Sequence, residues 1–155
     1  MTEKIHHNLE GVPKTLLMTL NVRARESQCP DATFKDEKAV IMVNMLDCDF
    51  SQLRMQRHDE VAVIMRMNKF DSHVRDFLLR NPEAMVVHIG CGLDTRFDRV
   101  DNGQVQWFDL DVPEVMELRQ KLLVGESSRY HTFATSVFDV GWLDEIDKFN
   151  QNPIM

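Results

Sequence analysis

Two glycines separated by one residue follow directly on a short apolar run, and this segment has the clearest chemical meaning in the sequence. The run Val86–Ile89 is rich in β-branched residues, and Gly90 and Gly92 come immediately after it. Glycines at such positions let the backbone turn sharply and approach a ligand closely, because no Cβ is in the way. The pattern predicts a strand that enters a nucleotide-binding turn.

A second apolar run ends in acidic residues, Asp109 and Asp111. Rossmann-like units place a ribose-binding carboxylate at such a position, about 20 residues after the glycines. Asp111 is also a candidate cap for a helix that begins near Pro113. Thr95 stands where the dinucleotide fingerprint usually has its third glycine, so a cofactor without phosphates fits the turn better. Recognition of a nucleoside without phosphates points to S-adenosylmethionine.

Helices and strands must position these residues. The sequence has a helical first half and a second half in which strands alternate with helices. Helical spacing predicts helices over residues 13–26, 36–46 and 59–79, the last of them ending before Asn81-Pro82. From residue 84 onward, strands are predicted at 85–89, 107–110 and 130–137, with helices over 113–124 and from 141. Strands that alternate with helices indicate a parallel sheet.

The predicted fold class is therefore α/β. An N-terminal helical cap (residues 1–82) precedes the first half of a Rossmann-like doubly wound parallel sheet (residues 83–155), and the two parts are expected to form one compact unit.

Composition excludes several classes of protein. The net charge of −7 and the pI of 5.3 argue against a nucleic-acid partner, which usually requires a basic surface. No apolar run approaches the ~20 residues of a membrane helix, and the N-terminus lacks the apolar core of a secretory signal. The three cysteines have no CxxC spacing, so neither a disulfide framework nor a metal site is expected. These features predict a globular, cytoplasmic protein that binds neither membrane nor nucleic acid.

The strings Gly90–Arg96 and Asp109–Val115 together resemble the signature of the leucine carboxyl methyltransferase family and its bacterial relatives, the polyketide-type O-methyltransferases. The segments Thr15–Leu17, Arg23–Ser27 and Phe34–Ala39 resemble the helical cap of the bacterial branch. The resemblance implies an enzyme that transfers a methyl group from S-adenosylmethionine to a carboxylate or hydroxyl oxygen of a small molecule. A carboxylate acceptor is already ionised and needs no general base, whereas a hydroxyl acceptor needs one. No catalytic residue is assigned.

The resemblance also implies roles for matching residues on the ribose and methionine sides of the cofactor. Gly90, together with Gly92 in the same turn, is expected to lie against the methionine part. Asp111 is expected to hold the ribose, with Asp109 as the alternative.

Two arginines and one dipeptide complete the expected cofactor site. By the same resemblance, Arg66 is expected to pair with the cofactor's carboxylate, and Arg23 to lie near the same group. Ser136 and Val137 stand where relatives have an Asp-Leu pair that contacts the adenine, so the backbone amide of Val137 is the remaining candidate for that contact. His88, inside the first predicted strand, is interpreted as a core histidine, and Cys91 as a small packing residue.

About three strands are predicted, whereas a complete enzyme of this type resembles a seven-stranded sheet in a chain nearly twice as long. The strand at 85–89 then becomes an exposed edge, which is prone to pairing. The expected explanations are a homo-oligomer, a separately encoded second half or a truncated chain, and truncation is favoured. Two alternative functions remain: a noncatalytic interaction protein derived from a methyltransferase half, and a nicotinamide-dependent oxidoreductase half-domain.

Overall fold

Helices make up the first half of the chain, and a small parallel sheet with flanking helices makes up the second. The structure is a computed structural model that describes residues 4–5, 14–123, 127–149 and 155. It has a mixed α/β fold, as the sequence predicts. The elements in chain order are α1 (Lys14–Ser27), α2 (Glu37–Met45), η1 (Phe50–Leu53), α3 (Arg57–Arg80), β1 (Met85–Ile89), α4 (Arg96–Val100), β2 (Gln106–Asp111), α5 (Pro113–Leu122), β3 (Tyr130–Ala134) and α6 (Gly141–Asp147).

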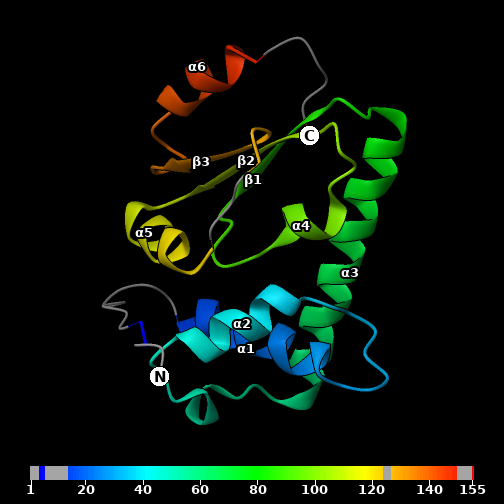
Figure 1. Ribbon diagram of the computed structural model, residues 1–155, viewed down its shortest axis with the longest axis vertical. Coiled ribbons are helices and arrows are strands. Elements are labelled where there is room, and N and C mark those ends of the chain that lie inside the picture. Colours follow the sequence, from blue (N-terminus) through cyan, green and yellow to red (C-terminus); the bar gives the residue numbers. More distant parts are fainter. Residues whose placement is uncertain (1–3, 6–13, 124–126, 150–154) are drawn as a thin grey trace.

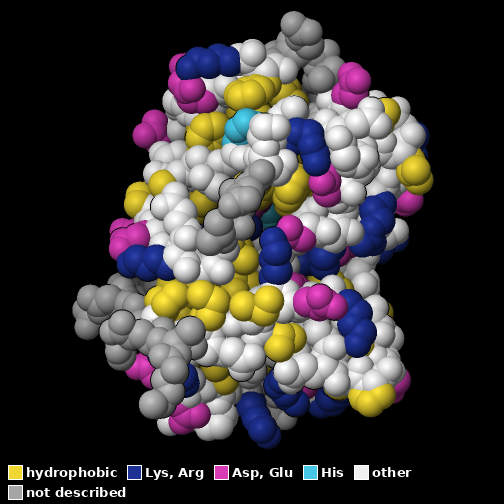
Figure 2. All heavy atoms as spheres, viewed as in Figure 1, with side chains coloured by type: hydrophobic (Ala, Val, Ile, Leu, Met, Phe, Trp, Pro, Cys, Tyr) yellow, Lys and Arg dark blue, Asp and Glu magenta, His cyan; other side chains and the backbone are white. Residues whose placement is uncertain are grey.

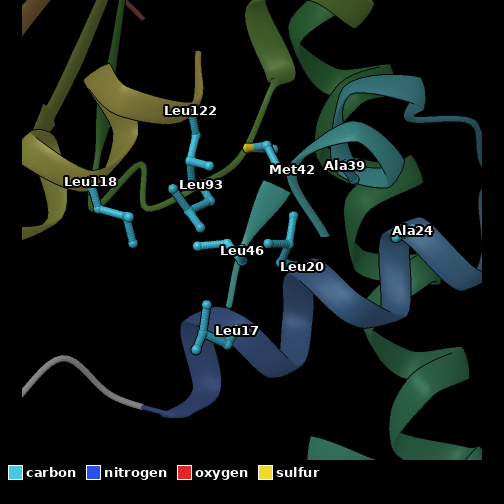
Figure 3. Close-up of a cluster of buried hydrophobic side chains, with 9 residues drawn as sticks. All are labelled: Leu17, Leu20, Ala24, Ala39, Met42, Leu46, Leu93, Leu118 and Leu122. Carbon is cyan, nitrogen blue, oxygen red and sulfur yellow. The ribbon is translucent and has the colours of Figure 1, made fainter. Parts of the chain in front are cut away.

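An apolar cluster joins the helices α1 and α2 to the sheet part of the molecule. Figure 3 shows side chains of α1, of α2 and of Leu46 at the end of α2 facing Leu93, Leu118 and Leu122, which belong to the glycine turn and α5. All of these side chains are buried, so the cluster removes a large apolar surface from water. Its members are Leu17, Leu20, Ala24, Ala39, Met42, Leu46, Leu93, Leu118 and Leu122.

Helix α3 extends along both parts of the molecule (Figure 1). Its 24 residues correspond to a length of about 36 Å. Near its start, Val63 and Ile64 pack with Val22 of α1, and near its end Val74 and Leu78 pack against β1 and β2. The middle of this helix therefore has a fixed position between the two parts.

The three strands form one parallel sheet in the order β1-β2-β3. Val87 pairs with Phe108, and Phe108 pairs with His131. Figure 1 shows α6 on one side of this sheet and α4 and α5 on the other. Strand β1 is an edge, as the sequence predicts, although Met155 bonds to it through two backbone hydrogen bonds, from its N–H to Met85 O (2.9 Å) and from Val87 N–H to its own carbonyl (3.0 Å).

The predicted elements are all present, with differences at their ends. The third strand stops at Ala134 rather than at residue 137, and the elements η1 and α4 were not predicted. The N-cap of α5 is Val112, so the prediction of Asp111 as the cap is wrong. The Asp111 carboxylate instead accepts hydrogen bonds from the N–H groups of Gly92 and Val112. In the part of the chain that the structure describes, no helix is long and apolar enough to cross a membrane.

Candidate functional site

The turn after β1 needs glycine at both of the predicted positions. Gly90 and Gly92 have φ angles of 65° and 52°, in the left-handed region that disfavours side chains. Gly90 N–H donates to Leu110 O at 2.8 Å, which fixes the start of the turn to the end of β2. A Cβ at Gly92 would lie 3.2 Å from Leu16 Cδ1 of α1, so this glycine also permits close packing of the turn on the cap.

Asp111 is held directly at this turn. Its Oδ2 accepts a hydrogen bond from Gly92 N–H at 2.8 Å, and its Oδ1 accepts one from Val112 N–H at 2.8 Å. Each carboxylate oxygen keeps acceptor capacity for a further donor. The carboxylate is thus fixed at the end of β2 and can accept hydrogen bonds from a ligand.

A cleft of about 910 Å³ lies where the cap meets the ends of β1 and β2. This volume is within the range of small-molecule and cofactor sites. Figure 2 shows a band of hydrophobic side chains at the level where the sheet part meets α1 and α2, with charged side chains beside it. The cleft is lined by Thr15, Leu16, Thr19 and Arg23 of α1, Arg66, Met67 and Phe70 of α3, Val87–Asp94 and Arg96 of β1, the turn and α4, and Asp111, Val112, Glu114 and Val115 of β2 and α5.

Arg66 lines this cleft with an exposed side chain. Within the described part of the chain, no carboxylate forms an ion pair with its guanidinium. A cation without a protein partner at the wall of a cleft is free to bind an anionic group of a ligand.

Arg23 also lines the cleft, but most of its guanidinium is already bonded. It is 1% exposed; Nη1 pairs with Asp36, and Nη2 donates to Leu93 O at 2.8 Å. Its Nε is the one buried side-chain nitrogen or oxygen without a hydrogen-bond partner among the described residues. Arg23 therefore ties α1 to the N-cap of α2 and to the turn, and it retains one unused donor.

Asp94 of the turn lies in a buried network of arginines. Its carboxylate is 2.9 Å from Arg99, 3.0 Å from Arg96 and 3.9 Å from Arg23. Burial alone would raise the pKa of Asp94, but the three guanidinium groups outweigh burial and hold this pKa well below its usual range. Asp94 is therefore an ionised structural anion and not a proton acceptor.

Asp109 points away from the cleft and into the core. It is 1% exposed, and its carboxylate accepts hydrogen bonds from His88 (3.0 Å), Trp107 (2.7 Å), Tyr130 and Arg119. Burial would raise the pKa of Asp109, but the hydrogen bond from His88 and the charge of Arg119 lower it further than burial raises it. Of the two acids considered for the ribose, the geometry favours Asp111.

The residues expected at the adenine lie outside the cleft lining. Ser136 and Val137 follow the end of β3. Ser136 Oγ accepts a hydrogen bond from Phe138 N–H at 3.3 Å, and Val137 O accepts one from Trp142 Nε1 at 3.1 Å. The N–H of Val137 forms no hydrogen bond with the described residues.

The cysteine between the glycines is not a nucleophile. Cys91 is 2% exposed, and its Sγ lies 3.6 Å from Met116 Sδ. Burial and the charge of Asp109 raise the pKa of this thiol far above its ordinary value. Cys91 is a packing residue, as the sequence indicates.

The interpretation of His88 as a core histidine is incomplete, because the residue also lines the cleft. The residues that sequence reasoning missed are Asp71, Arg96 and Arg99, which surround Asp94. The only signal in the sequence was Arg96 and Arg99 three residues apart just after the turn, a spacing that places them on one helix face.

Sequence comparison with known proteins finds matches to methyltransferases. A family model described as leucine carboxyl methyltransferase matches residues 16–138. The chain is similar to the tetracenomycin polyketide synthesis O-methyltransferase TcmP of Streptomyces glaucescens, with 38% identity over 90% of this chain and 52% of that protein. It is also similar to the S-adenosyl-L-methionine-dependent methyltransferase dpfgK of Gibberella zeae, with 27% identity over 95% of this chain and 54% of that protein. The chain thus spans about half the length of the curated relatives that it matches.

Proposed function

Because this chain belongs to the leucine carboxyl methyltransferase family, we propose that its cleft is an S-adenosylmethionine site. As part of a whole methyltransferase, it would serve transfer of a methyl group to a carboxylate or hydroxyl oxygen of a small molecule. The observation that carries the proposal is Asp111, fixed by the glycine turn at a cleft that also presents Arg66, which has no ion pair within the described residues.

The residues of the cleft fit the two polar ends of this cofactor. Asp111 would accept hydrogen bonds from the ribose hydroxyls through the lone pairs that Gly92 and Val112 leave free. Arg66 would pair with the methionine carboxylate through its exposed guanidinium. Arg23, which is bonded to Asp36 and to Leu93 O, would support the same end of the cleft by holding the turn in place. Gly90 would let the cofactor approach the backbone, because its missing Cβ leaves open space.

The adenine would lie beyond the end of β3, near Ser136 and Val137. Ser136 carries no charge to attract the adenine amine, and its hydroxyl already accepts a bond from Phe138 N–H. The N–H of Val137, which has no hydrogen-bond partner among the described residues, is the group that we propose for this contact.

When bound, S-adenosylmethionine supplies a methyl group activated by the positive sulfonium. The chain's own contribution is to orient the cofactor and to exclude water from one side of it, through the apolar wall that Phe70, Ile89 and Val112 provide. A carboxylate acceptor would need no base from this chain. The buried acids Asp94 and Asp109 are saturated by their partners, so neither is proposed as a base for a hydroxyl acceptor.

A dinucleotide-dependent oxidoreductase is less well supported by the same turn. Such enzymes use the N–H groups of the turn and the following helix for the pyrophosphate. Here the N–H of Gly92 is occupied by Asp111, and the helix that follows, α4, has only five residues.

Calorimetric titration with S-adenosylhomocysteine and with NAD⁺ tests the proposal. We expect saturable one-to-one binding of S-adenosylhomocysteine and none of NAD⁺. Binding of NAD⁺ alone would establish the oxidoreductase alternative. Binding of neither would contradict the proposal and favour a noncatalytic interaction protein.

We also propose that the β1 edge pairs with a further strand from a second copy of the chain. The support is that Ile89 is 52% exposed at this edge, beyond Met85 and Val87, whose outward-facing groups bond to Met155. We further propose a cytoplasmic location. Cys29, Cys48 and Cys91 are free thiols, as is usual in a reducing compartment.

A further inference from the structure

His88 lies between two clusters of charged side chains and faces the cleft. On one side its Nδ1 is 3.0 Å from Asp109 Oδ1, in the core cluster that Arg119 and Tyr130 complete. On the other side its Nε2 is 3.1 Å from Arg96 Nη1. The ring also packs edge-on against Trp107, with 6.0 Å between the ring centroids.

The chemistry of these two neighbours fixes the protonation of the ring. Arginine has only donors, so Nε2 must accept the hydrogen bond from Arg96. Asp109 is ionised and has only acceptors, so Nδ1 must carry the proton. Only the neutral tautomer with its proton on Nδ1 satisfies both contacts. The other neutral tautomer would turn a proton toward Arg96 and a lone pair toward the carboxylate.

Arg96 in turn connects β1 to helix α3. Its Nε donates to Asp71 Oδ1 of α3 at 2.9 Å, and Nη2 lies 3.0 Å from Asp94 Oδ2 and 3.5 Å from Met67 Sδ. Its guanidinium lies 5.5 Å from the centre of the Phe70 ring. Met67 and Phe70 line the cleft on the same helix as Arg66.

We propose that His88 is a positioning residue that accepts a hydrogen bond from Arg96 and thereby holds the α3 wall of the cleft against the end of β1. It is not a general base, because both ring nitrogens are occupied. The inference itself concerns contacts within the chain; only its ligand readout rests on the proposed cofactor.

The acceptor at Nε2 is what Arg96 requires of position 88. A side chain without an acceptor there would leave the N–H of Arg96 without its partner on β1. We therefore expect the cleft to bind its ligand less tightly when this acceptor is removed.

Nitrogen-15 NMR of protein labelled at histidine tests the tautomer directly and without a ligand. We expect the His88 ring near neutral pH to show a protonated Nδ1 and an unprotonated Nε2, with the signal assigned by its loss in His88→Gln. A ring with its proton on Nε2, or one that exchanges freely between the two tautomers, would contradict the proposal.

Calorimetric titration with S-adenosylhomocysteine near neutral pH tests the consequence. His88→Gln keeps an acceptor that can face Arg96, so we expect affinity within about twofold of the wild type. His88→Leu removes the acceptor and should bind about tenfold more weakly.

His73→Gln is the matched control, since His73 is exposed on α3 and does not line the cleft. It should bind with wild-type affinity. Equal affinities of the wild type and a folded His88→Leu, or an equal loss in His88→Gln and His88→Leu, would overturn the inference about position 88. Failure of the wild type to bind at all would count against the proposed cofactor, and the NMR measurement would still decide the role of His88.

Discussion

Arg66 is the residue whose surroundings most favour contact with a ligand. The other two arginines of the cleft lining, Arg23 and Arg96, are bonded to carboxylates, whereas Arg66 is exposed and unpaired within the described residues. An arginine that forms no ion pair in the protein contributes little to stability. Its replacement should therefore affect binding and leave folding unchanged.

We expect Arg66→Gln to weaken binding of S-adenosylhomocysteine about tenfold, because a charge-assisted hydrogen bond to the amino-acid carboxylate is lost. Binding of methylthioadenosine, which lacks that carboxylate, should be unchanged. Both affinities can be measured by calorimetry. Lys69→Gln is the control, since Lys69 is exposed on the same helix and does not line the cleft. Equal losses for both ligands would place Arg66 away from the carboxylate.

Asp94 illustrates the opposite case, a residue near the cleft whose role is structural. We expect Asp94→Asn to lower the free energy of unfolding by about 3–5 kcal/mol, because one buried and two partly buried guanidinium groups lose their shared anion. Urea titration at neutral pH measures this change. Asp98→Asn, which breaks only the exposed pair with Lys38, should have little effect.

The same carboxylate predicts a direction for the pH dependence of stability. The folded-state pKa of Asp94 is lowered, so its contribution is fully present above the unfolded-state pKa of about 3.9 and is lost as the pH falls through the folded-state value. The stability difference between wild type and Asp94→Asn should therefore shrink below about pH 4. A difference that stays constant from neutral to acidic pH would contradict this account.

At the scale of elements, the glycine turn connects β1, β2 and α1. Gly92→Ala must adopt a left-handed conformation and also bring its Cβ within 3.2 Å of Leu16. We expect it to cost about 1–2 kcal/mol of stability and to weaken ligand binding, as measured by urea unfolding and calorimetry. Gly141→Ala, at a helical position in α6 with only ordinary contacts, is the control and should be tolerated. If the two variants behave alike, the turn does not need glycine.

The sequence predicts those elements whose local signals agree. The spacing of Leu16, Leu17 and Leu20 and the cap at Asp36 predict helices α1 and α2 to within one or two residues. The β-branched run Met85–Ile89 coincides with β1, because a short apolar segment that ends in glycine has few other structures open to it.

What the sequence could not predict depends on contacts between distant segments. Asp109 and Asp111 stand two residues apart at the end of one strand, yet one is saturated in the core and the other faces the cleft. Local spacing also permits Asp111 as a helix cap, whereas in the structure its Oδ2 accepts a hydrogen bond from Gly92, 19 residues earlier. The bonds that place His88 between Asp109 and Arg96 involve three separate elements, and no local pattern encodes them.

At the scale of the whole molecule, helix α3 and the apolar cluster between α1, α2, the glycine turn and α5 join the cap to the sheet (Figures 1 and 3). We propose that residues 1–82 and 83–155 act as one unit for this reason. The sheet itself is narrow, with β1 as a free edge apart from its bonds to Met155.

We expect the chain to associate through that edge. Ala84 and Gly90, at the two ends of β1, bond to β2, whereas the N–H of Val87 bonds to Met155 on the other side. Because bonding alternates along a strand, the N–H of Ile89 also faces the open side. Ile89→Pro removes this donor and should shift the protein toward the monomer in sedimentation equilibrium. Leu79→Lys is the control. It changes an exposed apolar residue on α3, away from the β1 edge, and should leave association unchanged. A wild-type chain that is monomeric at all concentrations and unfolds cooperatively would contradict the proposal.

The central claim is that the cleft binds S-adenosylmethionine through Asp111, and a pair of dissociation constants tests it most directly. Calorimetry with S-adenosylhomocysteine should give saturable binding to the wild type and binding at least about 30-fold weaker to Asp111→Ala, because the acceptors for both ribose hydroxyls are removed. Asp109→Asn is the comparison variant, because Asp109 lies on the same strand but faces the core and contacts no ligand in this account. Circular dichroism of each variant reports whether the fold is kept. Equal affinities for the wild type and a folded Asp111→Ala would contradict the account.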